Sequence, residues 1–523
     1  MKLNRKKSRT RVPARTHEGA PACTVSAEKE LRRSVMACML WEGQFYEDGE
    51  SISDRIASLV ERVKPEKVAE IAIEARTSGN LRHVPLLLVR EMARRGGSIV
   101  SETLAEVIQR PDELSEFVSI YWKDGKQPLS AQVKKGLAKA FTKFSEYSLA
   151  KYDRDVDIRL RDVLYLCHAK PLDGREGYDK KARQRRPLKR LREQEQLFLR
   201  LVEGNLRAPD TWEVNLSAGE DKRETFERLI TEEKLGTLAL IKNLRNMQEA
   251  GVDEDLIREA LVTANTKRTL PFRFVTAAKY APRFESELEQ AMFRCLEKYT
   301  KLPGKTILIV DVSGSMYQGG VSGKSEVDRA EVACSLAVLI REVCEDARIY
   351  ATAGDDFAEV HKTEFVPARR GFALSDGIYK MCHPLGGGGI FLHQVLKYVE
   401  KKEGGTDRIV VITDEQDCDH NPARSPKNTV PFGDTNYLIN VASFKNGIGY
   451  GNWTHIDGWS DAVIEYIAAV EGHVRQTKPK RKVAIRKKAA KSKTATARGA
   501  NAAGKKIVAK RKTATKRISK TKK

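Results

Sequence analysis

The sequence predicts an α-solenoid of amphipathic helices, then a doubly wound α/β domain, and finally a disordered basic tail. Three observations lead to this fold class. Apolar residues recur at helical spacing through roughly the first 300 residues. From Lys305 onward, short β-branched runs alternate with helical segments. The last segment, 473–523, is rich in Lys, Ala and Thr and has no aromatic residue, so it cannot bury a core.

The helical part is preceded by a basic, polar arm, 1–16, which we expect to be disordered. Helices begin near Ser26 and are joined by short connections that contain Gly or Pro. No sequence period repeats strictly, which favours a HEAT-like array over a regular TPR or ankyrin array. The later helices are predicted at 53–63, 68–76, 82–95, 99–109, 112–121, 130–144, 159–168, 193–204, 222–232, 235–248, 255–263 and 283–299.

The α/β part is expected to form a sheet with helices on both faces, because strands and helices alternate along the chain. No strand-like alternation occurs before Thr306. Strands are predicted at 306–310, 347–353, 408–413 and 436–444, and helices at 326–344, 393–400 and 460–471.

Two of these strands end in acidic and hydroxyl side chains. The strand at 306–310 runs into Asp311, Ser313 and Ser315, and the strand at 408–413 runs into Asp414. Open α/β sheets place their ligand sites at such strand ends. Carboxylate and hydroxyl oxygens suit Mg²⁺ or Mn²⁺, with waters completing the shell. The alternative is a strand followed by an ordinary Asp/Ser/Gly turn.

This pair of strand ends resembles the von Willebrand factor A fold and its metal-ion-dependent adhesion site. Asp311, Ser313, Ser315 and Asp414 match the Asp-x-Ser-x-Ser and Asp elements of that pattern. The pattern's Thr is missing, since Gly389 or Ile390 stands where it is expected. The resemblance therefore implies a divalent-cation site that either binds metal more weakly or uses a water or a backbone carbonyl instead.

The net charge of +23 belongs almost wholly to the tail. From Arg475 to Lys523 there are 21 Lys and Arg and no acidic residue. Removing those 21 from the 94 basic residues leaves 73 against 71 acidic ones, a net charge of +2 for the rest. The tail resembles linker-histone tails in composition, which favours salt-dependent contact with phosphate backbones over a merely solubilising role.

Two local patches in the helical part have the chemistry of an RNA surface. The run 180–192 has eight basic residues in thirteen positions and no acid. It should contact phosphates, unless it is a flexible loop without a ligand. Its candidate contacts are Lys180, Lys181, Arg183, Arg185 and Arg186.

The second patch is the predicted helix 159–168. Its apolar residues can face the core, which leaves Arg161, Tyr165 and His168 on or beside the outer face. Cations and rings together contact phosphates and stack on unpaired bases. A purely structural role for His168 is the alternative on spacing alone.

Several segments together resemble the Ro autoantigen family, the TROVE-module RNA-binding proteins, in its bacterial branch. The similarity covers roughly 17–470 and leaves out both terminal arms. The segments that carry it are Lys151-Tyr152, Leu160–Pro171, Glu233–Leu240, Asn243–Met247 and Leu270–Phe274, followed by the A-type domain.

This resemblance implies a TROVE-type helical domain over 17–300 that forms a monomeric ring with an A-type domain over 301–472. It implies Y RNA on the outer surface, single-stranded ends of misfolded or precursor RNAs in the hole, and an exoribonuclease partner such as polynucleotide phosphorylase. By motif, Lys151 and His168 are the expected Y RNA contacts, with Arg154, Arg161 and Lys170 as neighbours. The protein would act in RNA quality control without catalysing a reaction.

Two other function classes are alternatives to RNA binding. An A-domain adhesion module on a helical scaffold would explain the cation residues, but not the tail or the basic run. A metal-dependent hydrolase would need a second carboxylate cluster or a nucleophile–base pair, and neither is evident. Asp355-Asp356 and Asp417/Asp419 have the pattern of ordinary loop residues. Eight scattered cysteines, no secretory signal and no membrane span favour a cytoplasmic protein.

Overall fold

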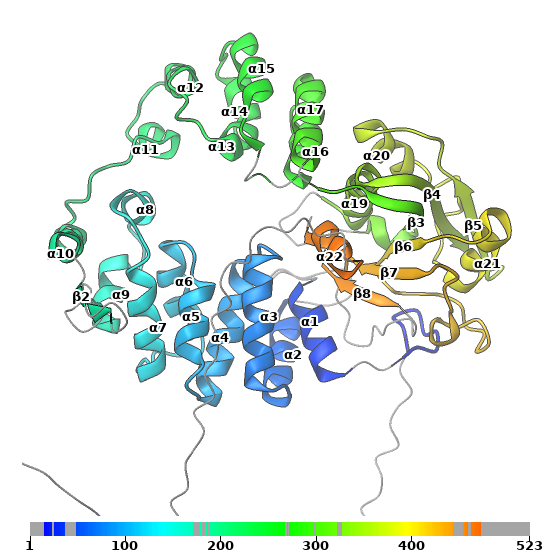
Figure 1. Ribbon diagram of the computed structural model, residues 1–523, viewed down its shortest axis with the longest axis horizontal. Coiled ribbons are helices and arrows are strands. Elements are labelled where there is room, and N and C mark those ends of the chain that lie inside the picture. The colour runs from blue at the N-terminus through cyan, green and yellow to red at the C-terminus, as the bar shows by residue number, and fades with distance from the viewer. Residues whose placement is uncertain are drawn as a thin grey trace, which may run out of the picture. The chain divides into compact units, whose positions relative to one another are not determined.

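A computed structural model describes 15–23, 26–36, 49–170, 178–179, 184–185, 188–266, 269, 271–297, 299–318, 320–321, 327–442, 453–458 and 462–471. The chain divides into two units, Met1–Arg475 and Gln476–Lys523. The whole second unit, and with it the predicted basic tail, lies outside the described residues, as do residues 1–14. Everything below concerns the first unit (Figure 1).

The first half of the helical region is a stack of short amphipathic helices around one apolar cluster that runs from Leu31 to Leu201. Most of these helices bury one apolar face, whereas α4 is buried on all sides from Val84 to Met92. These helices are α1 (Ala27–Met36), α2 (Gly49–Arg62), α3 (Pro65–Thr77), α4 (His83–Arg95), α5 (Val100–Val107), α6 (Asp112–Tyr121), α7 (Ala131–Phe141), α8 (Glu146–Tyr152), α9 (Leu160–Cys167) and α10 (Leu188–Glu203).

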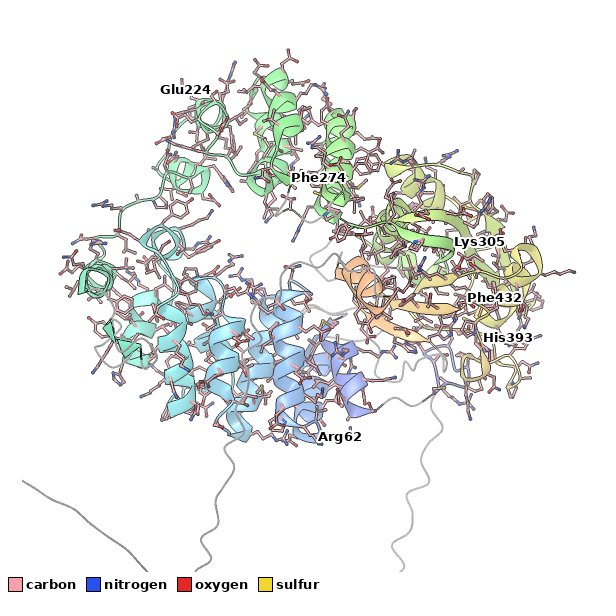
Figure 2. All side chains as sticks on the ribbon, in the orientation of Figure 1. Arg62, Glu224, Phe274, Lys305, His393 and Phe432 are labelled. Atoms are coloured by element: carbon pink, nitrogen blue, oxygen red, sulfur yellow. The ribbon has the colours of Figure 1, made fainter. Side chains whose placement is uncertain are left out.

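The second half of the helical region shares its core with the α/β domain, because one apolar cluster continues from Phe226 to Ile467. Phe274, labelled in Figure 2, is fully buried in it. The helices of this half are α11 (Trp212–Ser217), α12 (Lys222–Thr231), α13 (Thr237–Lys242), α14 (Leu244–Glu249), α15 (Glu254–Thr263), α16 (Phe272–Tyr280), η2 (Pro282–Phe284) and α17 (Glu285–Leu296).

The α/β domain contains a six-stranded sheet in the order β5-β4-β3-β6-β7-β8. All neighbouring strands pair in parallel except β5, which is antiparallel to β4 at the edge. The strands are β3 (Leu302–Asp311), β4 (Cys344–Asp355), β5 (Val360–Phe365), β6 (Arg408–Thr413), β7 (Thr435–Asn440) and β8 (Thr454–Asp457). The helices are α18 (Gly314–Tyr317), α19 (Arg329–Val343), α20 (Gly371–Tyr379), α21 (Leu392–Glu403), η3 (Pro426–Asn428) and α22 (Ala462–Val470).

Both faces of this sheet are covered, which explains the uninterrupted apolar runs of its central strands. Leu308 and Val310 of β3 point to the face that α19 and α22 cover. Ile307 and Ile309 point to the other face, where they pack with Val395 and Leu396 of α21. Helices on both faces of a mainly parallel sheet confirm the predicted doubly wound α/β class, and the antiparallel edge strand β5 makes the sheet mixed.

The sequence patterns missed the shortest elements and the edges. A two-stranded hairpin, β1 (Tyr178–Asp179) with β2 (Gln184–Arg185), precedes Thr306, contrary to the prediction that no strand does. The predicted helix 235–248 is two helices, α13 and α14. The predictions also omit α8, α11, α16, α20, β5 and β8, which have four to nine residues each. An element this short is recognised only where its few apolar residues form a clear pattern.

Candidate nucleic-acid interface and cation site

Helix α9 presents one polar face and buries the other. Its four apolar side chains, Leu160, Val163, Leu164 and Cys167, are at most 7% exposed. On the opposite face Arg161 and Tyr165 are exposed, Tyr165 to 60%. The buried face is the one that the spacing predicts. A large aromatic ring exposed beside a cation has the chemistry to stack on an unpaired base.

Both ends of α9 are fixed by local hydrogen bonds. At its start the Arg159 amide donates to Asp162 Oδ2 at 2.9 Å, which satisfies one of the free amides of a helix N-terminus. At its end His168 adopts the left-handed conformation, with φ of 52°, and the chain turns away. This turn leaves His168 exposed next to the polar face of α9.

The remaining residues predicted from the resemblance flank α9 on two sides. Arg154 lies exposed in the connection before α9, and Lys170 lies exposed after it. Lys151, near the end of α8, is instead partly enclosed and forms a salt bridge with Glu213 of α11, Nζ to Oε1, at 3.2 Å. An RNA phosphate that contacts Lys151 must therefore compete with Glu213.

Further cations lie around Lys151, and the sequence patterns did not single them out as contacts. Lys242 at the end of α13 and Arg273 in α16 are exposed, and neither forms a salt bridge within the described part of the chain. Partial burial, together with the charges of Arg273, Arg110 and Lys151, lowers the pKa of Lys242. We call Arg110, Lys151, Lys242 and Arg273 the inter-helix cation cluster.

Arg110 links this cluster to an aromatic ring. Its guanidinium lies 4.7 Å from the centre of the Tyr152 ring and donates to Asp112 Oδ2 at 2.8 Å. Four cations therefore gather from three helices and the connection between α5 and α6, with Glu213 as the carboxylate that acts on Lys242. No local run of basic residues marks the cluster, because only the packing of short helices assembles it.

The basic run 180–192 cannot be placed as an RNA surface. Lys180, Lys181, Arg183 and Arg186 lie outside the described residues, and Arg185 lies in β2 with its side chain outside them as well. Their contacts with phosphates stay a prediction.

The residues predicted to hold a cation come together at the ends of β3 and β6. Asp311 and Asp414 are 0% and 1% exposed. The Ser313 amide donates to Asp311 Oδ1 at 2.8 Å, and the Ser315 hydroxyl donates to Asp414 Oδ2 at 2.8 Å. The Ser313 and Ser315 hydroxyl oxygens are 3.3 Å apart. All four side chains therefore converge on one point.

These donors fit a hard divalent cation. Burial and the nearby charge of Asp414 raise the pKa of Asp311 to about 7. A cation between two buried carboxylates would stabilise both in the charged form. Within the described residues, His, Cys, Asp and Glu side chains nowhere gather in threes as metal ligands. Two carboxylates and two serine hydroxyls would thus hold the ion, with other oxygens completing the shell.

Thr413 is a residue of this site that the sequence analysis missed. Its hydroxyl donates to Asp311 Oδ2 at 2.6 Å. Its position directly before Asp414, at a strand end, was the available signal.

The glycine-rich segment that contains Gly387 and Gly388 packs its backbone against the turn beside the cation residues. Ile390, one of the two residues in the expected Thr position, is fully buried in the apolar core. The Gly314 amide donates to Gly388 O at 3.2 Å, and a Cβ on Gly314 would lie 2.7 Å from Gly387 O. Backbone carbonyls thus lie against the turn that holds the serines.

The other acidic loops serve the backbone. Asp417 accepts from the amides of Leu392 and Asp419 at 2.9 and 2.8 Å, and Asp356 accepts from Gly389 at 2.7 Å. They are loop-ordering carboxylates, as expected for ordinary loop residues.

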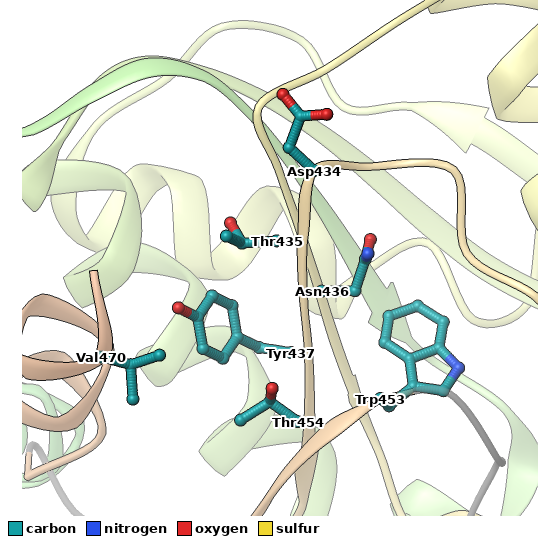
Figure 3. A pocket seen from close by; sticks show the side chains of 7 residues that line it. All are labelled: Asp434, Thr435, Asn436, Tyr437, Trp453, Thr454 and Val470. Atoms are coloured by element: carbon teal, nitrogen blue, oxygen red, sulfur yellow. The ribbon is translucent and has the colours of Figure 1, made fainter.

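A polar pocket of about 490 Å³ lies at the start of β7, which is the end of that strand far from the cation residues (Figure 3). Its lining includes Thr435, at the start of β7, whereas Asn440, at the end of β7, pairs with Thr413 beside the cation residues. Among the described residues that line it, Asp434 is acidic and none is cationic, so this part of the lining does not suit a phosphate. Separately, no helix in the described part of the chain is both long and apolar enough to cross a bilayer.

Comparisons with known proteins show which sequences and folds this chain resembles. The TROVE domain family model matches residues 203–361. Telomerase protein component 1 of Mus musculus is 30% identical over 110 residues, which is 20% of this chain but only 4% of that protein's length. The crystal structure of the Ro (Rsr) protein of Deinococcus radiodurans matches with a TM-score of 0.53 and 17% identity, over 86% of this chain and 100% of that one. Residues 203–361 are therefore similar to the TROVE domain, and the chain shares the fold of the Deinococcus Ro protein.

Proposed function

We propose that this protein is a non-catalytic RNA-binding component of a ribonucleoprotein, and that the polar face of α9 contacts a small structured RNA of the Y type. The observation that carries this proposal is the grouping of Arg161, Tyr165 and His168 on one exposed face whose opposite side is fully buried. A phosphate-binding cation and a base-stacking ring on one rigid helix suit RNA with unpaired bases.

The inter-helix cation cluster extends this surface. Lys242 and Arg273 form no salt bridge within the described residues, although the charge of Glu213 acts on Lys242. A phosphate that contacts these two cations therefore displaces no ion pair. Partial burial and the positive charges of Arg273, Arg110 and Lys151 lower the pKa of Lys242. A bound phosphate would offset the repulsion between these cations. We assign this cluster to single-stranded ends of misfolded or precursor RNA, which an exoribonuclease partner would then trim.

Crosslinking and sequencing of the RNA bound to a chain that ends at Glu471 tests the proposal directly. We expect one abundant structured RNA with crosslinks near Lys151 and His168. Lys151→Ala together with His168→Ala should weaken its binding while the fold, followed by circular dichroism, stays intact. Lys397→Ala with His393→Ala on α21 is the matched control. Equal affinity of both double variants at fixed salt would contradict the assignment and favour a protein-interaction module.

The cation site is a second proposal, on the same chain. We propose that Asp311, Ser313, Ser315 and Asp414 bind Mg²⁺ or Mn²⁺. The ion would supply charge compensation for the two buried carboxylates and an open coordination position. Isothermal titration with Mn²⁺ tests this, with Asp414→Asn as the variant that should lose binding.

A further inference from the structure

The N-terminal segment is bound to the same loop that supplies a cation ligand. Arg33, on α1, is 5% exposed and donates to Glu415 Oε2. Its Nε also lies 3.5 Å from Asp457 Oδ1, at the end of β8. Glu415 accepts in addition from His455, with Nδ1 to Oε1 at 3.0 Å. A buried arginine fork thus joins α1 to two strand ends of the sheet.

Glu415 follows Asp414 directly, and the backbone sends the two side chains to different partners. Glu415 has a φ of 61°, in the left-handed region that a side-chain-bearing residue adopts only when its surroundings hold it there. Asp414 reaches Ser315, whereas Glu415 reaches Arg33. A shift of this turn that releases one carboxylate must therefore move the other.

A second, independent connection runs through Gln416. The His17 amide donates to Gln416 Oε1 at 2.6 Å. Gln416 in turn donates from its backbone amide to Asp414 Oδ1 at 3.2 Å and from its side chain to Asp414 O at 3.1 Å. The Thr16 hydroxyl donates to Asp417 O at 2.9 Å. Residues before the first helix thus help to hold the Asp414 carboxylate.

We propose that residues 15–21 and α1 are a positioning element for the cation site, so that their seating on the loop Asp414–Asp417 and cation binding at Asp311 and Asp414 are thermodynamically linked. This inference rests on the proposed cation site. Linkage requires that the cation stabilise the seated segment by the same factor by which the seated segment strengthens cation binding. Glu415 and Gln416 transmit it and are positioning residues, since neither is assigned to touch the ion.

Hydrogen exchange on the full chain, with and without Mn²⁺, tests the linkage alongside Mn²⁺ calorimetry. In the wild type we expect Mn²⁺ to slow exchange in peptides covering 26–36 by about tenfold. Arg33→Gln should abolish this protection and raise the Mn²⁺ Kd by the same factor. If Arg33→Gln does not fold, Arg33→Lys replaces it. Lysine keeps the charge but cannot reach Glu415 and Asp457 with one planar group. The Mn²⁺ Kd of Arg33→Lys should therefore also be higher than that of the wild type.

Arg32→Gln is the matched control, because Arg32 is the next residue of the same helix and pairs with Glu74 of α3 instead. It should leave the Mn²⁺ Kd and the protection within about twofold of wild type. An Arg33 variant that exposes α1 yet binds Mn²⁺ like the wild type would overturn the linkage. A flat Mn²⁺ titration of the wild type would overturn it as well, together with the cation site, and would leave the RNA proposal standing.

Discussion

Replacing Lys242 and Arg273 by glutamine should make RNA binding weaker and less dependent on salt. Each phosphate contact with single-stranded RNA contributes a slope of about −0.7 to log K against log[salt]. Loss of two contacts therefore makes the slope less negative by about 1.4. If counterion release is the whole effect, affinity falls about 70-fold at 50 mM salt and about 10-fold at 200 mM.

The assay is fluorescence anisotropy with a labelled single-stranded RNA at four or five salt concentrations, using the chain truncated after Glu471. The control replaces Arg245 on α14, next to the cluster, and Lys397 on α21, both exposed and paired with a glutamate within their own helix. It removes the same total charge. A control that loses as much slope as the cluster variant would refute a local phosphate site and leave only net charge as the cause.

Three other outcomes are expected. Glu213→Gln should strengthen RNA binding several-fold, because it frees Lys151 from its 3.2 Å salt bridge; anisotropy titration measures this. Glu113→Ala should destabilise the fold by about 3–5 kcal/mol, since it leaves the buried Arg76 uncompensated, and urea unfolding monitored at 222 nm gives the value. Ser315→Ala should weaken Mn²⁺ binding without weakening RNA binding, and calorimetry beside anisotropy separates the two.

The predictable parts of the fold are those with a clear period. The strand at 408–413 matches β6 residue for residue, because a fully buried parallel strand is a continuous apolar run. Helix α9 was placed to within about a residue at each end because four apolar residues at helical spacing bury one face. The cation residues followed from the same logic, since parallel strands β3 and β6 are neighbours and end at one edge.

The parts that sequence reasoning missed are those that only tertiary packing creates. Lys242 and Arg110 are far apart in the chain and lie in no charge run, so no window of sequence brings them together. Arg33 sits in a helix full of charges, and nothing local distinguishes it from its neighbour Arg32. The difference is that Arg33 is buried against Glu415, whereas Arg32 remains at a partly exposed pair.

The charge distribution suggests how the parts of this chain divide the work of binding RNA. Without its tail the chain carries a net charge of only +2, so it exerts little long-range attraction on a polyanion. Many of its cations, Lys151 among them, are already paired with carboxylates. Binding to such a surface replaces one ion pair by another and gains little unless the ligand fits several contacts at once.

On our proposal the tail, with 21 cations and no acid, supplies salt-dependent encounter with RNA of any sequence. The polar face of α9 and the inter-helix cation cluster then supply the selection. Deleting 475–523 should therefore lower the affinity for all RNAs and flatten their common salt slope, while the ratio of affinities between a structured RNA and a random strand stays unchanged. A ratio that collapses together with the slope would place selection in the tail and contradict this division.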